Sequence, residues 1–134
     1  MHVIVCVDNQ MGMQFHHRRQ SRDSALMDRL LKMTQGRQLL ISPISQKLFS
    51  DFPNLIVSED FLSQAGPEDF CFVEDRALEN FEDQIQSLIL CKWNRDYPAD
   101  LFLSLDLTAF HLTETTEFPG TSHEKITIEV YRKC

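Results

Sequence analysis

One short segment concentrates positive charge in an otherwise acidic chain. Residues 15–23 read FHHRRQSRD, and the side chains in it that suit an anion are those of His17, Arg18, Arg19 and Arg22. Arginine makes bidentate contacts to phosphate and carboxylate groups. The segment precedes and begins an expected helix, where free N–H groups and the helix dipole also favour anions. It therefore predicts a binding site for a small anionic ligand or for a protein partner.

The same cations have a plainer interpretation. The chain carries 20 Asp and Glu residues against 13 Lys and Arg residues. The arginines of the segment can therefore pair with the protein's own acidic surplus, as surface charges commonly do. Both interpretations stay open at the level of the sequence.

Two other places carry side chains that invite a chemical interpretation. Trp93 follows an apolar run and, with Lys92, can line a cleft, although a single Trp is more often a core or rim residue. We include Trp93 among the candidate ligand-binding residues. His123 stands between Ser122 and Glu124. Neighbours in a strand point to opposite faces and cannot form a catalytic triad, so we interpret this stretch as a polar turn.

The net charge and the composition of the chain argue against several classes of binding partner. The net charge is −7 and the isoelectric point is near 5.1, whereas a nucleic-acid binder usually has a basic face. No stretch approaches the roughly 20 apolar residues that span a bilayer. The cysteines form no C-x-x-C pair and three of them lie inside apolar runs, which is typical of reduced, buried thiols. We expect no nucleic acid, no membrane, no metal and a cytoplasmic protein.

Hydrophobic periodicity predicts strand–helix repeats followed by a hairpin. We expect a flexible lid at 8–20 around Gly12, and a helix that has Ser21 as its N-cap and ends at Gly36. Pro119-Gly120 suits the central pair of a type II turn. The remaining elements are strands at 2–7, 37–42, 54–58, 70–73, 87–93 and 101–105, helices at 45–52 and 75–85, and hairpin strands at 110–118 and 125–132.

This order predicts one α/β domain over residues 1–134, a mixed and mostly parallel sheet with a C-terminal antiparallel hairpin and helices on both faces. Several segments together resemble dihydrofolate reductase. The first strand running into VDNQMGM is similar to that family's first strand and mobile loop, and SALMDRLLKMTQGRQLLIS to its substrate-side helix and second strand. FCFVEDRALENFEDQIQSLILCKW is similar to its cofactor half, and FHLTETTEF with HEKITIEVYRK to its closing hairpin. The resemblance implies a three-layer dihydrofolate reductase-like fold.

The chain also resembles short bacterial hypothetical proteins that often carry the label "ribonuclease Z". An enzyme of that type needs an H-x-H-x-D-H cluster that holds two zinc ions. No three of the five histidines in this chain fall in such a cluster. A nuclease is therefore the least favoured function.

The reductase resemblance implies one candidate catalytic residue. The family's lone buried acid lies near the start of the substrate-side helix, and Asp23 stands within a turn of that place, with Asp28 as a rival. The alternatives from the residues alone are a partner of the helix dipole for Asp23 and a solvated face for Asp28.

The chain departs from the family where the cofactor would bind. The reductase turns on consecutive glycines so that backbone N–H groups can approach a pyrophosphate, but the matching positions are Glu74 and Asp75. Two carboxylates there would repel a diphosphate. Ser42 and Pro43 stand where the family has a glycine and a basic residue, and SDFPN lacks the arginine that grips the folate tail.

We therefore expect a dihydrofolate reductase-like domain that has lost its NADPH pyrophosphate site and holds no cofactor. It would bind a small anionic ligand or a protein partner through residues 8–23. The alternative is a divergent oxidoreductase that uses NADPH or flavin, with Asp23 as the catalytic residue. The sequence does not indicate the oligomeric state.

Overall fold

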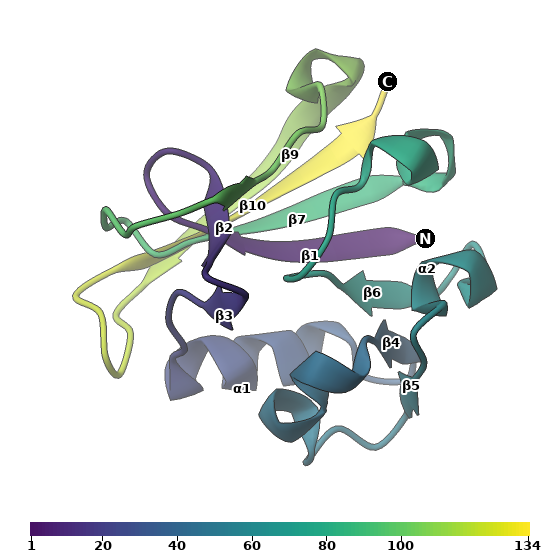
Figure 1. Ribbon diagram of the computed structural model, residues 1–134, viewed down its shortest axis with the longest axis horizontal. Coiled ribbons are helices and arrows are strands. Elements are labelled where there is room, and N and C mark those ends of the chain that lie inside the picture. Colours follow the sequence, from purple (N-terminus) through teal and green to yellow (C-terminus); the bar gives the residue numbers. More distant parts are fainter.

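The computed structural model describes residues 1–134 and is built on a seven-stranded sheet (Figure 1). Five parallel strands form most of it, in the spatial order β5 (Leu55–Val57), β4 (Leu39–Ile41), β6 (Phe70–Phe72), β1 (His2–Val7) and β7 (Ser87–Lys92). The last two strands, β10 (Ile126–Lys133) and β9 (Phe110–Phe118), complete the sheet as an antiparallel hairpin beside β7. The expected mixed sheet with a closing hairpin is confirmed.

Alternation along the central strand sends side chains to two separate cores. Val3, Val5 and Val7 belong to one apolar cluster, which also holds Phe61 of the helix α2 (Phe61–Gln64). The residue Ile4 belongs to the other cluster, with residues of the helix α1 (Ser24–Met33) and the 3-10 helix η1 (Pro43–Phe49). Because successive strand residues face opposite sides, helices cover both faces. The α/β class and its three layers are therefore as expected.

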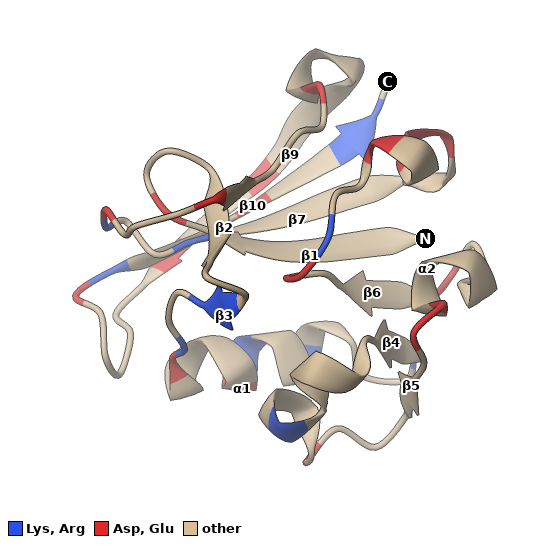
Figure 2. Ribbon diagram, in the orientation of Figure 1, with Lys and Arg blue, Asp and Glu red and all other residues tan.

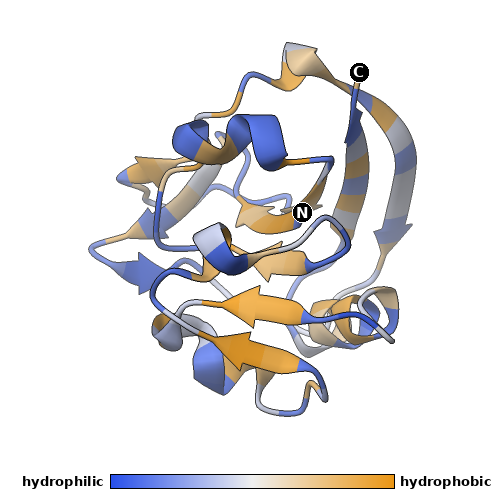
Figure 3. Cartoon of the chain, turned by 90° about the vertical axis from the view of Figure 1, so that its right-hand side faces the viewer, coloured by the Kyte–Doolittle hydropathy of each residue, from blue (hydrophilic) through white to orange (hydrophobic).

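The parallel strands and the hairpin differ in how they are buried. All residues of β7 except Lys92 are buried, whereas β9 is exposed over most of its length. Figure 3 shows this difference: the short parallel strands are coloured as hydrophobic, whereas hydrophobic and hydrophilic residues alternate along the hairpin strands. A parallel strand covered on both faces needs a continuous apolar run, and an outer antiparallel strand does not.

The segment expected to be a lid loop is instead a small second sheet. Its strands are β2 (Gly12–Phe15), β3 (Arg18–Arg19) and β8 (Leu101–Phe102), in the order β3-β2-β8. Two residues, His16 and His17, join β2 to β3 with φ angles of 49° and 60°. Positive φ at both central residues is what a type I′ hairpin turn requires. The expectation of a plain loop missed this turn because His-His is not a typical pair for it.

Three other local expectations need correction. Asp23, not Ser21, is the N-cap of α1, and its side chain accepts from the N–H groups of Ala25 and Leu26. The expected helix at 75–85 is only the 3-10 helix η2 (Glu79–Gln84). The preceding segment is tied to other elements, because the Ser42 hydroxyl donates to Asp75 and Arg76 donates to the Glu59 carbonyl. The short helix expected at 45–52 is η1, and a further 3-10 turn is η3 (Leu107–Ala109).

The hairpin loop also differs from the expected type II turn. Such a turn needs positive φ at its second central residue, but Gly36 is the one glycine with a positive φ angle. Gly120 serves another purpose: a Cβ atom there would lie 2.6 Å from Asp23 Oδ2. The loop is therefore wider than a two-residue turn and packs its backbone against the start of α1.

The chain contains no helix that is both long enough and apolar enough to cross a membrane.

The His16–His17 turn yields a first prediction. Replacing the pair by Asn-Gly should raise the free energy of unfolding by about 1 kcal/mol, because side chains other than Gly, Asn and Asp pay a steric cost in left-handed backbone. Urea denaturation of His16→Asn/His17→Gly measures this effect. The control is His111→Asn, at an exposed position of β9, which should give no gain. A destabilised double variant would contradict the assigned turn.

Candidate functional site

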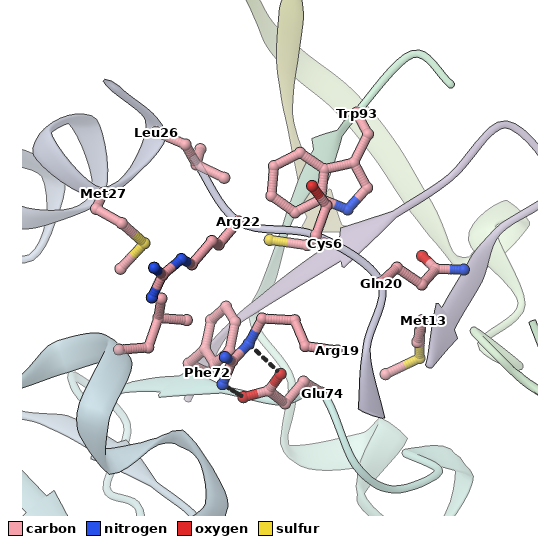
Figure 4. A pocket seen from close by; sticks show the side chains of 12 residues that line it. Cys6, Met13, Arg19, Gln20, Arg22, Leu26, Met27, Phe72, Glu74 and Trp93 are labelled. Atoms are coloured by element: carbon pink, nitrogen blue, oxygen red, sulfur yellow. Dashed lines mark hydrogen bonds and ion pairs between the residues drawn. The ribbon is translucent and has the colours of Figure 1, made fainter. Parts of the chain in front are cut away.

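A small cavity lies where the carboxyl ends of β1 and β7 meet the β2–β3 hairpin and the start of α1 (Figure 4). Cys6, Met13 and Phe72 form part of its apolar lining, and Arg19, Arg22 and Glu74 add charge. The space that a water-sized sphere can reach measures about 10 Å³, which holds roughly one water molecule. The site is thus closed by its own side chains.

An ion pair between Arg19 and Glu74 crosses one side of this cavity (Figure 4). Arg19 donates from Nε and Nη2 to the two oxygens of Glu74 at 2.7 Å each. The Ser45 hydroxyl donates to Glu74 Oε2. The Glu74 side chain is 6% exposed and that of Arg19 is 29% exposed. The structure therefore shows Arg19 paired with an acidic residue of the protein itself, which is the plainer of the two interpretations given above.

Arg18 lies on the other side of the same strand and forms no ion pair. It is exposed and lines a separate open pocket of about 530 Å³ together with Phe15, His16, Gln20 and Tyr97. Figure 2 shows β3 as a patch of positive charge beside the start of α1. This pocket, called the cationic pocket below, is defined by Phe15, His16, Arg18, Arg19, Gln20, Tyr97 and Pro98.

The remaining candidate ligand-binding residues occupy three different places. Arg22 is exposed, forms no ion pair and lines the closed cavity. His17 is exposed at the hairpin turn and does not line either pocket. Trp93 is 3% exposed and lines the closed cavity, with its ring stacked on that of His123 at 4.7 Å between centroids. The structure thus brings Arg18 and Arg19 together at the cationic pocket, but not His17.

Gln20 lies between the two pockets and has an unusual amide. Its Nε2 donates to Asp8 Oδ2 at 3.1 Å and to the Pro98 carbonyl at 3.3 Å. The amide oxygen is then left buried without any hydrogen-bond donor. A buried acceptor without a partner costs free energy, so this atom is a place where a ligand or water donor would be favourable.

Asp23 is the most heavily hydrogen-bonded side chain in this part of the molecule. Besides capping α1, its carboxylate accepts from the N–H groups of Thr121 at 3.0 Å and Ser122 at 2.7 Å. It also pairs with His123 Nδ1 at 3.0 Å. Burial alone would raise the pKa of Asp23, but the N–H of Thr121, the His123 ring and the N–H of Ser122 hold it well below its usual range.

His123 is the residue that sequence reasoning missed. It is 4% exposed rather than part of a solvated turn. Its Nε2 lies 3.1 Å from Ser21 Oγ and 3.0 Å from the Tyr97 hydroxyl. The neighbours Ser122 and Glu124 indeed form no triad with it, as expected, because its side-chain partners come from segments far away in the sequence. The one available signal was a histidine beside a glycine-containing turn, which is too common to be informative.

Glu74 and Asp75, the two carboxylates noted at the end of β6, are both engaged. Asp75 accepts from the Ser42 hydroxyl at 3.1 Å and pairs with Arg76 at 2.9 Å. Glu74 is held by Arg19 and Ser45, as described. The end of β6 therefore presents anchored negative side chains. Elsewhere, burial raises the pKa of the Cys71 thiol to about 12, and all four cysteines are free.

Comparison with solved structures shows which known fold this architecture resembles. A dihydrofolate reductase from Enterococcus faecalis, complexed with NADP(H) and RAB-propyl, has a TM-score of 0.70 and 11% sequence identity to this chain. The alignment covers 98% of this chain and 94% of the reductase. No family model and no curated protein match the sequence.

The likeness shows the fold alone. The chain has a dihydrofolate reductase-like fold over nearly its whole length. The expected resemblance in architecture is thus confirmed, whereas no comparison supports the resemblance to proteins labelled "ribonuclease Z".

The Arg19–Glu74 pair yields a second prediction. Glu74→Gln should lower the free energy of unfolding by about 2 kcal/mol, because Arg19 loses a charge-assisted partner in a mostly buried site. Adding Arg19→Met to that variant should recover part of the loss. Chemical denaturation of the single and double variants measures the coupling. The exposed pair of Arg37 and Glu68 is the control, since Glu68→Gln should leave stability unchanged. Additive effects at Arg19 and Glu74 would contradict the pair.

The Asp23 cluster yields a third prediction. The pKa of Asp23 is lower in the folded protein than the usual value near 4, so its contribution to stability is complete above about pH 5. That contribution is lost as the pH falls through the folded-state pKa. Asp23→Asn should cost about 2–3 kcal/mol at neutral pH and should flatten the loss of stability in acid. Urea denaturation from pH 7 to pH 3 measures both effects.

The matched control is Asp28→Asn, an exposed position on the same helix. It should keep the acid-dependent loss of stability. An Asp23→Asn variant with the wild-type dependence on pH would show that another group controls it.

Proposed function

We propose that this chain is a dihydrofolate reductase-like domain that binds a small anionic ligand in the cationic pocket and has lost the NADPH pyrophosphate site. The observation that carries the proposal is Arg18, an exposed guanidinium without an acidic partner at the edge of a 530 Å³ concavity. In a protein of net charge −7, a cation left unpaired beside a pocket is available for a ligand. A guanidinium suits carboxylate or phosphate oxygens.

The surroundings of Arg18 favour a small ligand over an extended protein surface. His16 adds a second nitrogen-bearing side chain, and Tyr97 adds a hydroxyl. The backbone of His16 and His17 is held in left-handed conformations, and strained backbone of this kind tends to cluster at ligand sites. A compact anion would contact the Arg18 guanidinium and the side chains that line the pocket beside it.

The end of β6 supports the loss of the pyrophosphate site. Glu74 fills the space near Arg19, and its carboxylate is fixed by two arginine contacts and one hydroxyl. A diphosphate at this place would face Glu74 and Asp75 and would have to compete with Glu74 for Arg19. The candidate catalytic role of Asp23 is retained in this proposal as an ionised carboxylate rather than a proton donor, since its pKa is held low. We also place the protein in the cytosol, in keeping with its four free thiols.

The fourth prediction tests this site directly. Titration of labelled protein with inorganic phosphate, pyrophosphate and succinate, followed by NMR, should shift the backbone signals of His16, Arg18 and Gln20. Arg18→Ala should weaken the binding of the preferred anion about tenfold, the effect of losing one charge-assisted contact. Lys47→Ala is the control, because Lys47 is an exposed cation outside both pockets.

Two results would count against the proposal. Equal binding by wild type and Arg18→Ala would remove the cationic pocket as the anion site. Tight binding of NADPH with shifts at Glu74 and Asp75 would restore the cofactor site and favour the divergent oxidoreductase instead.

A further inference from the structure

Three segments far apart in the sequence bring an acid, an imidazole and two hydroxyls together. Asp23 precedes α1, Tyr97 follows β7, and His123 lies in the loop between β9 and β10. Asp23 Oδ2 is 3.0 Å from His123 Nδ1, and His123 Nε2 is 3.1 Å from Ser21 Oγ. The order carboxylate, imidazole, hydroxyl is the arrangement that activates a serine as a nucleophile.

The hydrogen bonds fix which nitrogen of His123 carries the proton. Asp23 is ionised and can only accept, so His123 Nδ1 must donate to it. In the neutral ring Nε2 is then an acceptor, and the hydroxyls of Ser21 and Tyr97 compete to donate to it. The ring is held in this orientation by Trp93, which stacks on it with an interplanar angle of 20°. An imidazole held in this orientation, with Nε2 beside a serine hydroxyl, is placed to take a proton from it.

Ser21 and Tyr97 are the partly exposed members of this set, whereas His123 and Asp23 are buried. Ser21 lines the closed cavity and Tyr97 lines the cationic pocket. The Arg22 side chain lines the same cavity and forms no ion pair. The backbone N–H groups of Ser21 and Arg22 have no acceptor within the protein. Donors of this kind stabilise the negative oxygen that forms when a carbonyl is attacked.

We propose that Ser21, His123 and Asp23 form a catalytic site for acyl transfer, with a short-chain acyl ester as the substrate class. Ser21 Oγ bonds to the ester carbonyl carbon while its proton passes to His123 Nε2. The bond from that carbon to the alkoxy oxygen then breaks, and His123 returns the proton to the departing alcohol. A water molecule repeats the sequence on the acyl-serine, which releases the carboxylic acid and restores Ser21. Asp23 is a positioning residue that holds the imidazole.

The neighbouring cationic pocket narrows the substrate class, and this part rests on the function proposed above. Arg19 and Gln20 line both pockets, and Tyr97 lines the cationic pocket while its hydroxyl contacts His123. An ester whose alcohol portion carries a carboxylate can therefore place its charge near Arg18 and its acyl group near Ser21. Because the cavity holds roughly one water molecule, the side chains that close it must move to admit even a short acyl group.

The fifth prediction uses two ester probes that separate hydrolysis from anion binding. Wild-type protein should hydrolyse the neutral ester 4-nitrophenyl acetate and the anionic ester 4-acetoxybenzoate. Ser21→Ala should lower both rates by about 100-fold or more. Arg18→Ala should raise KM for 4-acetoxybenzoate by a larger factor than KM for 4-nitrophenyl acetate. Ser24→Ala is the matched control, because Ser24 bonds Thr121 and does not contact His123.

A covalent probe gives a second readout that a purely structural role would not produce. A fluorophosphonate should add to Ser21, as shown by intact mass and peptide mapping, and Ser21→Ala should prevent the addition. His123→Gln should slow the addition, and circular dichroism checks that this variant is folded. A larger loss of 4-acetoxybenzoate hydrolysis than of 4-nitrophenyl acetate hydrolysis in Arg18→Ala would support both proposals. Wild-type rates for both esters in that variant would overturn only the anion site.

Two outcomes would overturn the acyl-transfer proposal. The first is a Ser21→Ala variant that hydrolyses both esters as fast as the wild type, whether or not its melting temperature changes. The second is a probe adduct on Tyr97 instead of Ser21.

Discussion

A buried carboxylate at the start of α1 determines how the two ends of this chain fit together. Asp23 accepts from N–H groups of its own helix and from the loop between β9 and β10, and it holds the imidazole of His123. Burying a negative charge is costly unless donors surround it. Here the donors come from two segments, so the charge is stable only when both are in place. Gly120 permits the approach, because a side chain at that position would meet the carboxylate.

A second buried carboxylate, that of Glu74, has its negative charge compensated in a different way. Asp23 is neutralised mainly by backbone N–H dipoles and one imidazole, whereas Glu74 is neutralised by the full charge of Arg19. In the first arrangement, the other ring nitrogen of His123 contacts the hydroxyls of Ser21 and Tyr97. The second arrangement locks an arginine that the sequence placed among candidate ligands. The two carboxylates therefore differ in what they hold: Glu74 pairs with Arg19 at the closed cavity, whereas Asp23 holds the His123 ring.

Much of the fold was accessible from local patterns, but the site was not. The apolar runs of β1 and β7 and the alternation in β9 and β10 predict the sheet, because burial on two faces or one leaves a visible period. The cationic segment at 15–23 could likewise be recognised from its His and Arg content. The Asp23–His123 contact joins positions 100 residues apart. A local hydrophobic pattern in the sequence cannot indicate such a contact. The same contact explains why Asp23 caps α1 although Ser21 is also a good capping residue.

The distance along the chain between Asp23 and its partners has a consequence for synthesis. A ribosome delivers Asp23 and α1 well before the loop that holds His123, which follows Asp23 by 100 residues. Until then, the Asp23 carboxylate can be capped only by its own helix and by water. Fragments that end before β10 would also lack the neighbour that β7 pairs with on its outer side. Proteins dominated by such distant contacts fold slowly, so the nascent chain cannot complete these contacts until the His123 loop and β10 have been synthesised.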